Sequence, residues 1–236
     1  MDIKVLASGS AGNCYWISDG VTPLLLECGI PIKQIRQGLN FGLSDVTACL
    51  LTHEHGDHSK AIKDVLRAGI DIYTSPGTID ALGLENHRLR PVRDKQSFVV
   101  GTWVVRAFET QHDAKEPLGF LLHSKATSER LVFATDTYYV RYKFPGLTHI
   151  MIECNYAADI LQANVDAGLV HPAMRRRLLT SHFSLENVKE FLKANDLSKV
   201  QEIHLLHLSD GNSDADRFKR EIMAVCGKPV YIAGGG

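Results

Sequence analysis

The amino-acid sequence predicts a mixed α/β protein in which β-sheets pack between helices. Short apolar segments with strand periodicity alternate with turn-forming residues, and amphipathic helical patterns dominate the last quarter of the chain. No long Pro/Gly/Ser-rich linker and no internal sequence repeat divides the chain. Strands and helices that share one continuous core are typical of α/β architecture. We therefore expect one domain over residues 1–236.

The composition is that of a foldable, soluble chain. Of 236 residues, 44% are hydrophobic and 22% are charged, with 26 Lys+Arg against 27 Asp+Glu. This excludes disorder for most of the chain, and the formal net charge of −1 excludes a binder that relies on global attraction to polyanions. No apolar run approaches the roughly 18 residues of a membrane helix, and the first residues lack a secretion-signal pattern. We expect a cytoplasmic protein.

The cysteines give no sign of a disulfide framework or of a thiolate metal site. Their number is odd, they are widely spaced, and none belongs to a C-x-x-C pair. We expect reduced and mostly buried thiols. The five positions are Cys14, Cys28, Cys49, Cys154 and Cys226.

The chain opens with strands. Apolar residues separated by turn-rich stretches predict a β-meander over residues 3–6, 14–17 and 24–26. A further apolar run, 48–51, is typical of a short buried strand. The next apolar residues recur at helical spacing until a glycine ends the pattern, which predicts a helix that contains Ile62, Val65 and Leu66 and ends at Gly69.

The middle of the chain returns to strands, and helices follow near its end. The further predicted strands are 70–73, 97–100, 103–108, 119–122, 131–134, 150–152, 203–207 and 230–232. One predicted helix begins after Ser184 as its N-cap. A second begins with a capping box formed by Ser213 and Asp216 and ends at Gly227.

Candidate metal ligands are concentrated in residues 52–58, which read Thr-His-Glu-His-Gly-Asp-His. His53 and His55 are two residues apart where an apolar strand ends, so both side chains point to the same side. Asp57 and His58 follow on a tight loop and the first helical turn. A polar helix cap with solvated imidazoles is the alternative, but it does not explain such dense spacing.

Four ligands within six residues cannot all serve one tetrahedral ion. The simplest arrangement is a pair of divalent ions about 3.5–4 Å apart. Imidazole and carboxylate ligands without thiolate suit Zn or Mn.

A pair of ions needs further ligands, and the ends of other predicted strands offer them. His112, Asp136 and His207 each follow or end an apolar strand. His204 lies an odd number of residues from His207, so in a regular strand the two face opposite sides and only one can be a ligand. We choose His207 because it borders a polar loop. An isolated histidine at a strand end is more often a hydrogen-bonded loop residue, but the shared position favours ligation.

The pattern His53-x-His55-x-Asp57-His58, followed by a later His, Asp and His, resembles the metallo-β-lactamase superfamily. Further segments resemble its bacterial YycJ/WalJ-type branch, whose members are metal-dependent nucleic-acid phosphodiesterases that include 5′-to-3′ exonucleases. These segments are 6–13 (LASGSAGN), 112–119 (HDAKEPLG), 182–187 (HFSLEN) and 207–212 (HLSDGN). The resemblance spans nearly the whole chain.

The resemblance implies a four-layer αββα sandwich with the metal site at one edge of the two sheets. It implies that one ion is held by His53, His55 and His112, and the other by Asp57, His58 and His207, with Asp136 as the bridge. The chain departs from the superfamily at two positions. Glu27 stands where Asp is usual at the end of an early strand, and Tyr138 stands where small residues are common.

Other residues are candidates for substrate contact, and each has a structural alternative. His182 can donate a proton or contact phosphate, or it is a solvated loop histidine. Arg175 and Arg176 can bind a phosphodiester backbone, or they form a solvated helix face. Tyr138 and two nearby tyrosines can stack on an unpaired base, or they pack inside the protein. Asn13 can support a metal ligand or a substrate phosphate, or it is a plain turn residue.

The sequence therefore predicts a dinuclear metallohydrolase that cleaves phosphodiesters, with Asp57 orienting the nucleophile and His182 as the proton donor. By the resemblance, the expected substrate is nucleic acid, and the expected activity is a 5′-to-3′ exonuclease on single-stranded DNA. Two alternatives stay open. One is hydrolysis of a small cyclic phosphodiester or cyclic nucleotide, and the other is a metal-stabilised binding module without catalysis.

Overall fold

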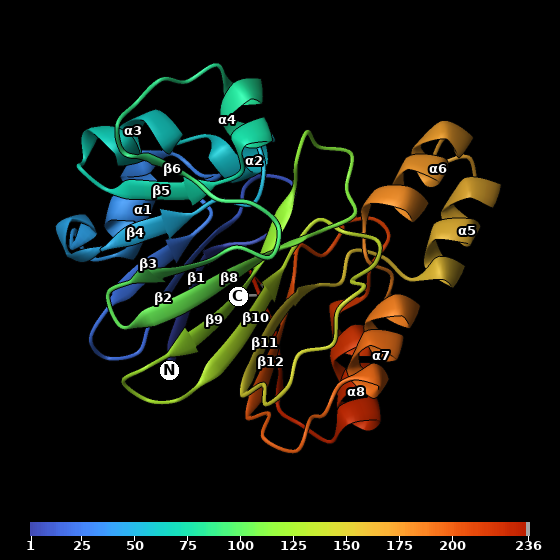
Figure 1. The fold of residues 1–236 in the computed structure, drawn as a ribbon. Helices are drawn as coiled ribbons and strands as arrows, with labels where there is room; N and C mark the ends of the chain where they lie inside the picture. The colour runs from blue at the N-terminus through green and yellow to red at the C-terminus, as the bar shows by residue number, and fades with distance from the viewer. Residues whose placement is uncertain (235–236) are drawn as a thin grey trace. The chain divides into compact units, whose positions relative to one another are not determined.

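The computed structural model describes residues 1–234, which fall into two compact units. The first unit comprises residues 1–109 and 114–129, and the second comprises residues 110–113 and the chain from 130 onward. Each unit combines strands with helices (Figure 1). The single domain over residues 1–236 stays a prediction, and residues 235 and 236 lie outside the described part of the chain.

The first unit begins with the predicted meander and extends it with parallel strands. β1 (Asp2–Ala7), β2 (Cys14–Ser18) and β3 (Pro23–Leu26) pair antiparallel. β4 (Ala48–Leu50), β5 (Asp71–Thr74) and β6 (Leu89–Pro91) then add in parallel. Parallel neighbours need crossover connections. Between these strands lie α1 (Ile32–Gly38), a 3-10 helix (Leu43–Asp45), α2 (Gly56–Ser59), α3 (Ile62–Arg67) and α4 (Pro76–Leu82).

Apolar residues of α3 pack against one face of this sheet, as their helical spacing predicts. Ile62, Val65 and Leu66 are buried in one cluster with Leu25 of β3 and Ile72 of β5. Figure 1 shows α1 and α3 beside these strands. The sheet and its helices therefore share one apolar core.

The first unit also contains an antiparallel ladder of β7 (Ser97–Val100), β8 (Trp103–Glu109) and β9 (Leu118–Ser124). Asp19, in the turn after β2, is buried and connects that turn to this ladder. Its carboxylate accepts hydrogen bonds from the hydroxyls of Thr102 and Ser124, both at 2.6 Å. It also accepts from the backbone N–H groups of Val21 and Thr22, at 3.1 and 2.9 Å.

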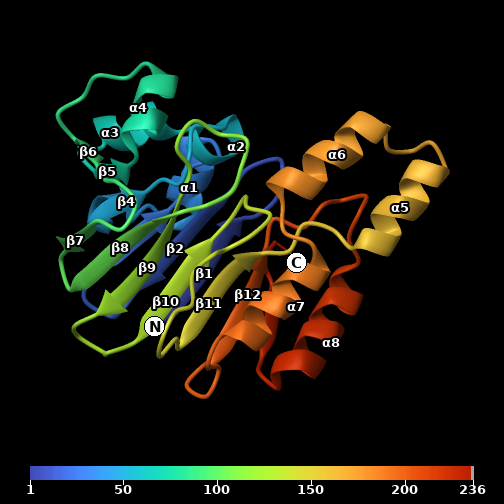
Figure 2. The same cartoon turned by 45° about the vertical axis from the view of Figure 1, so that its right-hand side comes forward.

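The second unit is built on a parallel ladder. β10 (Arg130–Ala134), β11 (His149–Glu153), β12 (Glu202–Leu206) and β13 (Val230–Ile232) pair in that order. Every residue of β11 is buried, as is typical of parallel strands. α7 (Leu185–Ala194) and α8 (Ala215–Cys226) contact each other and lie side by side next to β12 (Figures 1 and 2). α5 (Ala158–Asp166) and α6 (Pro172–Ser181) form a second contacting pair.

Most of the predicted elements are confirmed. Each predicted strand is present, with ends that differ by at most two residues. Ser184 is the N-cap of α7, and its hydroxyl accepts from the backbone N–H of Asn187 at 3.1 Å. The expectation of mostly buried free thiols is also confirmed, because only Cys226 among the cysteines is partly exposed. No helix within residues 1–234 is long and apolar enough to cross a membrane.

The predicted capping box at Ser213 is wrong by one residue. Asp214 is the N-cap of α8, because its Oδ1 accepts from the backbone N–H of Arg217 at 2.9 Å. The hydroxyl of Ser213 instead donates to the carbonyl oxygen of Ser209 at 2.6 Å. Several elements were not predicted at all, namely α1, α4, α5, α6 and β6.

Replacement of Asp19 by alanine should destabilise the protein. The substitution leaves two hydroxyls and two N–H groups without a charged acceptor, which should cost about 2–3 kcal/mol of unfolding free energy. Thermal and chemical unfolding would measure this loss. Asp80→Ala, on the exposed side of α4, is the matched control and should change stability little.

The Asp19 contribution should also depend on pH. Burial opposes the charged form, but hydrogen bonds from Ser124, Thr102 and the two backbone groups outweigh it and hold the pKa of Asp19 below its usual value. A depressed pKa in the folded state contributes stability above the unfolded pKa of about 3.9, and this contribution disappears as pH falls through the folded pKa. The stability difference between wild type and Asp19→Ala should therefore narrow below about pH 4. An equal difference at pH 7 and pH 3 would contradict this account.

Candidate metal centre

The first group of candidate ligands lies where β4 ends and α2 begins. Nε2 of His53 lies 3.1 Å from Nδ1 of His55, and the rings of His53 and His58 have centroids 4.2 Å apart. Oδ2 of Asp57 lies 3.3 Å from Nε2 of His58. His53 and His58 are buried, whereas His55 and Asp57 are partly exposed. The four predicted side chains of this segment thus converge within the first unit.

Backbone contacts hold this segment against two early loops. The N–H of Asn13 donates to the carbonyl oxygen of Asp57 at 2.7 Å, and the N–H of Cys28 donates to that of His58 at 2.9 Å. Gly29 passes so close that a Cβ there would lie 1.7 Å from the Asp57 carbonyl oxygen. Only glycine allows this approach.

Asn13 and Glu27 support His58 from two sides. Nδ2 of Asn13 lies 3.2 Å from Nε2 of His58, and its Oδ1 accepts from the hydroxyl of Tyr15 at 3.0 Å. Asn13 is fully buried, and its predicted contact with substrate stays a prediction. Oε2 of Glu27 lies 3.6 Å from Nδ1 of His58, and Oε1 accepts from the N–H of Thr52 at 3.3 Å. Burial raises the pKa of Glu27, although His58 opposes this. The Glu27 carboxylate therefore lies beside the candidate ligand His58.

The second group of candidate ligands, which lies in the second unit, consists of His112, Asp136 and His207. Nδ1 of His207 lies 2.7 Å from Oδ1 of Asp136, and Nε2 of His112 lies 3.5 Å from Oδ2 of Asp136. The other ring nitrogen of His112 pairs with the carbonyl oxygen of Ser181, at the end of α6, at 2.8 Å. Burial lowers the pKa of His112, although Asp136 opposes this, and the neutral imidazole that burial favours is the form that binds metals.

His204 lies in a different environment from His207. Its Nε2 pairs with Glu202 Oε1 at 3.1 Å, and its ring stacks on Tyr231 at 5.2 Å between centroids. His204 on β12 and His207 directly after it therefore make different contacts.

Asp136 and His207 share an uncommon backbone conformation. Their φ angles are +45° and +52°, and Glu27 in the first unit has φ +65°. Each directly follows a strand or lies within two residues of its end. Left-handed backbone at residues other than glycine is uncommon and is concentrated at functional sites. The turn at each strand end directs the polar side chain out of the strand's alternation.

Glu153 is a site residue that the sequence reasoning missed. It ends β11, is fully buried, and its Oε1 lies 2.5 Å from Nδ1 of His182 and 3.7 Å from Nδ1 of His207. Its Oε2 accepts from the N–H groups of Thr137 and Phe183, at 3.0 and 3.1 Å. The signal was present in the sequence, because Glu153 directly follows a predicted apolar strand, as Asp136 nearly does.

His182 follows α6 and lies beside the second group. Its ring centroid is 5.2 Å from that of His112 and 5.6 Å from that of His207. Burial lowers the pKa of His182, but the Glu153 carboxylate outweighs burial and raises it to about 9. Asp136, Glu153, His182 and His207 offer ligand atoms that all lie within 4.8 Å of one another. This donor set, carboxylate and imidazole without thiolate, fits a divalent cation such as Zn or Mn.

The candidate substrate contacts lie on α6 and on the segment after Asp136. Arg175 is partly exposed and Arg176 is exposed on α6, while Arg177 pairs with Asp113 at 2.8 Å. Tyr138 is exposed, and its carbonyl oxygen accepts from Nδ2 of Asn187 at 3.0 Å. The roles assigned to these residues stay predictions.

Comparison with known proteins identifies the family. A family model described as the beta-lactamase superfamily domain matches residues 24–207. Exodeoxyribonuclease YycJ of Bacillus anthracis is 26% identical over 231 residues, covering 90% of this chain and 84% of that protein. Exodeoxyribonuclease WalJ of Streptococcus pneumoniae serotype 2 (strain D39) is 29% identical over 229 residues, covering 89% of this chain and 82% of that protein.

A solved structure agrees with this match. The metallo-β-lactamase fold protein YhfI from Bacillus subtilis has a TM-score of 0.75 at 18% identity, covering 99% of this chain and 96% of that one. This likeness confirms the predicted fold class, a mixed α/β fold with two sheets and flanking helices. The chain belongs to the beta-lactamase superfamily and is a metal-dependent hydrolase with the metallo-β-lactamase fold.

Proposed function

We propose that the protein is a dinuclear phosphodiesterase that acts on nucleic acid, as a 5′-to-3′ exonuclease on single-stranded DNA. One observation carries the proposal: each unit gathers imidazole and carboxylate groups at the ends of its buried strands. Membership of the superfamily supports a centre to which both groups contribute. The similarity to two exodeoxyribonucleases supports DNA as the substrate. A cytoplasmic location stays a prediction.

The proposal assigns the ligands as the resemblance implies. One ion would be held by His53, His55 and His112 and the other by Asp57, His58 and His207, with Asp136 as a shared ligand. Zn or Mn fits these donors. When bound, such a pair of ions supplies an activated water at neutral pH and positive charge against the phosphoryl oxygens.

In this proposal, the chain's own residues position the substrate and move the protons. Asp57, whose side chain is partly exposed, orients the attacking water. His182 donates the proton to the leaving oxygen, and Glu153 fixes the orientation of its ring through the 2.5 Å contact at Nδ1. Arg175 and Arg176 on α6 contact phosphates of the strand, which makes binding depend on salt.

The substrate and polarity can be tested with chelated protein to which Mn or Zn has been restored. The substrates are 3′-labelled single-stranded DNA with and without a 5′-phosphate, the matching RNA, a duplex and a cyclic nucleotide. A ladder of progressively shorter labelled DNA strands is expected. Internal cuts would contradict exonuclease action, and turnover of the cyclic nucleotide alone would favour the small-substrate alternative. Two bound ions without turnover of any substrate would favour the binding module.

Removal of the Asp57 carboxylate should abolish turnover without unfolding the protein. Asp57→Asn and His58→Ala should each lower kcat/KM at least about a thousandfold, because they remove a ligand and, for Asp57, the group that orients the nucleophile. Circular dichroism should be little changed, because apolar strands supply most of the core. Asp64→Asn on α3 is the matched control. Near wild-type turnover by Asp57→Asn, or equal losses in the control, would refute the assignment.

Removal of His182 should affect substrates according to their leaving group. His182→Ala should slow cleavage of DNA about 10²- to 10⁴-fold, because the leaving alkoxide needs a proton. It should slow cleavage of bis(p-nitrophenyl) phosphate much less, because nitrophenolate leaves without one. Glu153→Gln should show the same pattern in weaker form. His204→Ala, which removes a histidine that contacts Glu202 and Tyr231, is the control. Equal losses on both substrates would contradict the role of His182.

A further inference from the structure

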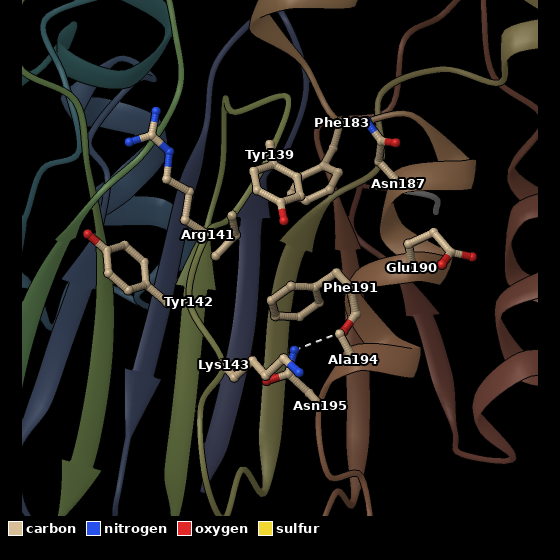
Figure 3. Close-up of a pocket in the computed structure, with 11 residues that line it drawn as sticks. Tyr139, Arg141, Tyr142, Lys143, Phe183, Asn187, Glu190, Phe191, Ala194 and Asn195 are labelled. Carbon is tan, nitrogen blue, oxygen red and sulfur yellow. Dashed lines mark hydrogen bonds between the residues drawn. The ribbon is translucent and has the colours of Figure 1, made fainter.

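A cavity of about 270 Å³ lies in the second unit, between the segment after Asp136 and α7 (Figure 3). The residues that matter for the argument are Tyr139, Arg141 and Lys143 on the segment, and Phe183, Asn187 and Phe191 on the side of α7. Figure 3 shows these two sets of side chains on either side of the hollow. None of the proposed metal ligands lines it.

Two asparagines hold the cavity in shape. The segment from residue 138 to 144 has no regular secondary structure, so side chains must fix its position. Nδ2 of Asn187 donates to the carbonyl oxygen of Tyr138 at 3.0 Å, and Oδ1 of Asn195 accepts from the N–H of Phe144 at 2.8 Å. Both asparagines come from α7 or its C-cap, and they hold the segment at its two ends. A ligand therefore meets walls that are already ordered, which lowers the entropy cost of binding.

The wall chemistry suits an unpaired nucleotide. Phe183 and Phe191 are buried, with ring centroids 6.4 Å apart, and form an apolar floor. Tyr139 is 53% exposed and presents its ring at the cavity. Lys143 is exposed at the same cavity, whereas the guanidinium of Arg141, which also lines it, donates to Oε1 of Gln111 at 2.9 Å. An aromatic surface for a base combined with cations for the backbone is the usual arrangement in proteins that bind single strands.

The carboxylate of Glu153 contacts both the proposed proton donor and residues next to the cavity. Phe183 directly follows His182, and Tyr139 lies two residues after Thr137. Oε2 of Glu153 accepts from the N–H groups of Thr137 and Phe183, and Oε1 pairs with His182. A ligand in the cavity is thus held at a fixed place relative to His182.

We propose that this cavity is a base-binding subsite, in which one unpaired nucleobase stacks on Tyr139 above Phe183 and Phe191 while a neighbouring phosphate meets Lys143. The inference rests on the proposed function, and it explains how the protein would prefer single-stranded DNA to a duplex. A volume of about 270 Å³ is just below the range of about 300–1,000 Å³ of small-molecule sites, which suits a single base rather than several. Paired bases are stacked in a duplex, so the subsite selects single strands.

The test compares Tyr139→Ala with Tyr139→Phe on two substrates. With single-stranded DNA, Tyr139→Ala should lower kcat/KM about 5- to 100-fold, the effect of losing one base stack. Tyr139→Phe, which keeps the ring, should retain most of the activity. Hydrolysis of bis(p-nitrophenyl) phosphate, which is too small to reach the subsite, should be unchanged. Tyr231→Ala is the matched control, because Tyr231 is a similarly exposed tyrosine outside the cavity.

Oligonucleotides with a single abasic site at successive positions locate the base. We expect one position at which loss of the base makes wild type cleave the substrate poorly. With that substrate, Tyr139→Ala should cause no further loss of cleavage rate. Anisotropy with a cleavage-resistant phosphorothioate strand gives a readout independent of turnover. The affinity of Tyr139→Ala should fall by a similar factor, and Lys143→Gln should reduce the slope of log K against log salt by about 0.7.

The outcomes separate this inference from the proposed function. If wild type cleaves DNA but Tyr139→Ala loses nothing, or loses as much with the small diester, the subsite is refuted and the function stands. The subsite is also refuted if Tyr139→Ala lowers cleavage of every abasic substrate, or if a duplex is bound as tightly as the single strand. If wild type cleaves only the small diester, the proposed function fails and the subsite fails with it.

Discussion

Burial of carboxylates at strand ends is the constraint on which the candidate centre depends. Glu27, Asp136 and Glu153 follow or end apolar strands and are almost inaccessible to water. A buried carboxylate is costly unless hydrogen bonds, cationic groups or metals compensate it. The chain therefore surrounds each of them with imidazoles or backbone N–H groups, such as His58 beside Glu27 and His182 beside Glu153. A divalent cation would provide the same compensation. The need to compensate these buried carboxylates therefore also makes the clusters suited to divalent metals.

The strands and the ends of the strands have opposite roles. β10, β11 and β12 are almost entirely buried and mostly apolar, and their parallel pairing fixes the backbone up to the last residue. Directly beyond them, Asp136 and His207 adopt positive φ, which costs of order 1–3 kcal/mol each. Such a conformation persists only where its surroundings determine it. The apolar strands therefore stabilise the strained ends that present the candidate ligands.

The sequence predicts what is encoded locally. The strands follow from short apolar runs bounded by turn-forming residues, and the cluster at His53 follows from its dense spacing, because both patterns lie within a few residues. Glu153 was not predicted as a site residue because a single acidic residue after an apolar strand is common. Only the structure reveals His182 beside it. The helices α5 and α6 were not predicted because their surfaces are mostly polar and exposed, so no apolar stripe marks them in the sequence. The burial of Asn13 was not predicted because the contacts that bury it come from residues far along the chain.

In the proposed function, the two oxygens of Glu153 would couple the proton donor to the base-binding subsite. One oxygen pairs with His182, and the other accepts from the N–H groups of Thr137 and Phe183. The carboxylate cannot move toward one set of partners without weakening its bonds to the other, so the imidazole and the walls of the cavity keep a fixed spacing. In the proposed function, that spacing decides which phosphodiester lies near His182 once a base is seated. A step of one nucleotide then returns an equivalent phosphodiester to the same place, which is the geometry that sequential removal of single nucleotides requires.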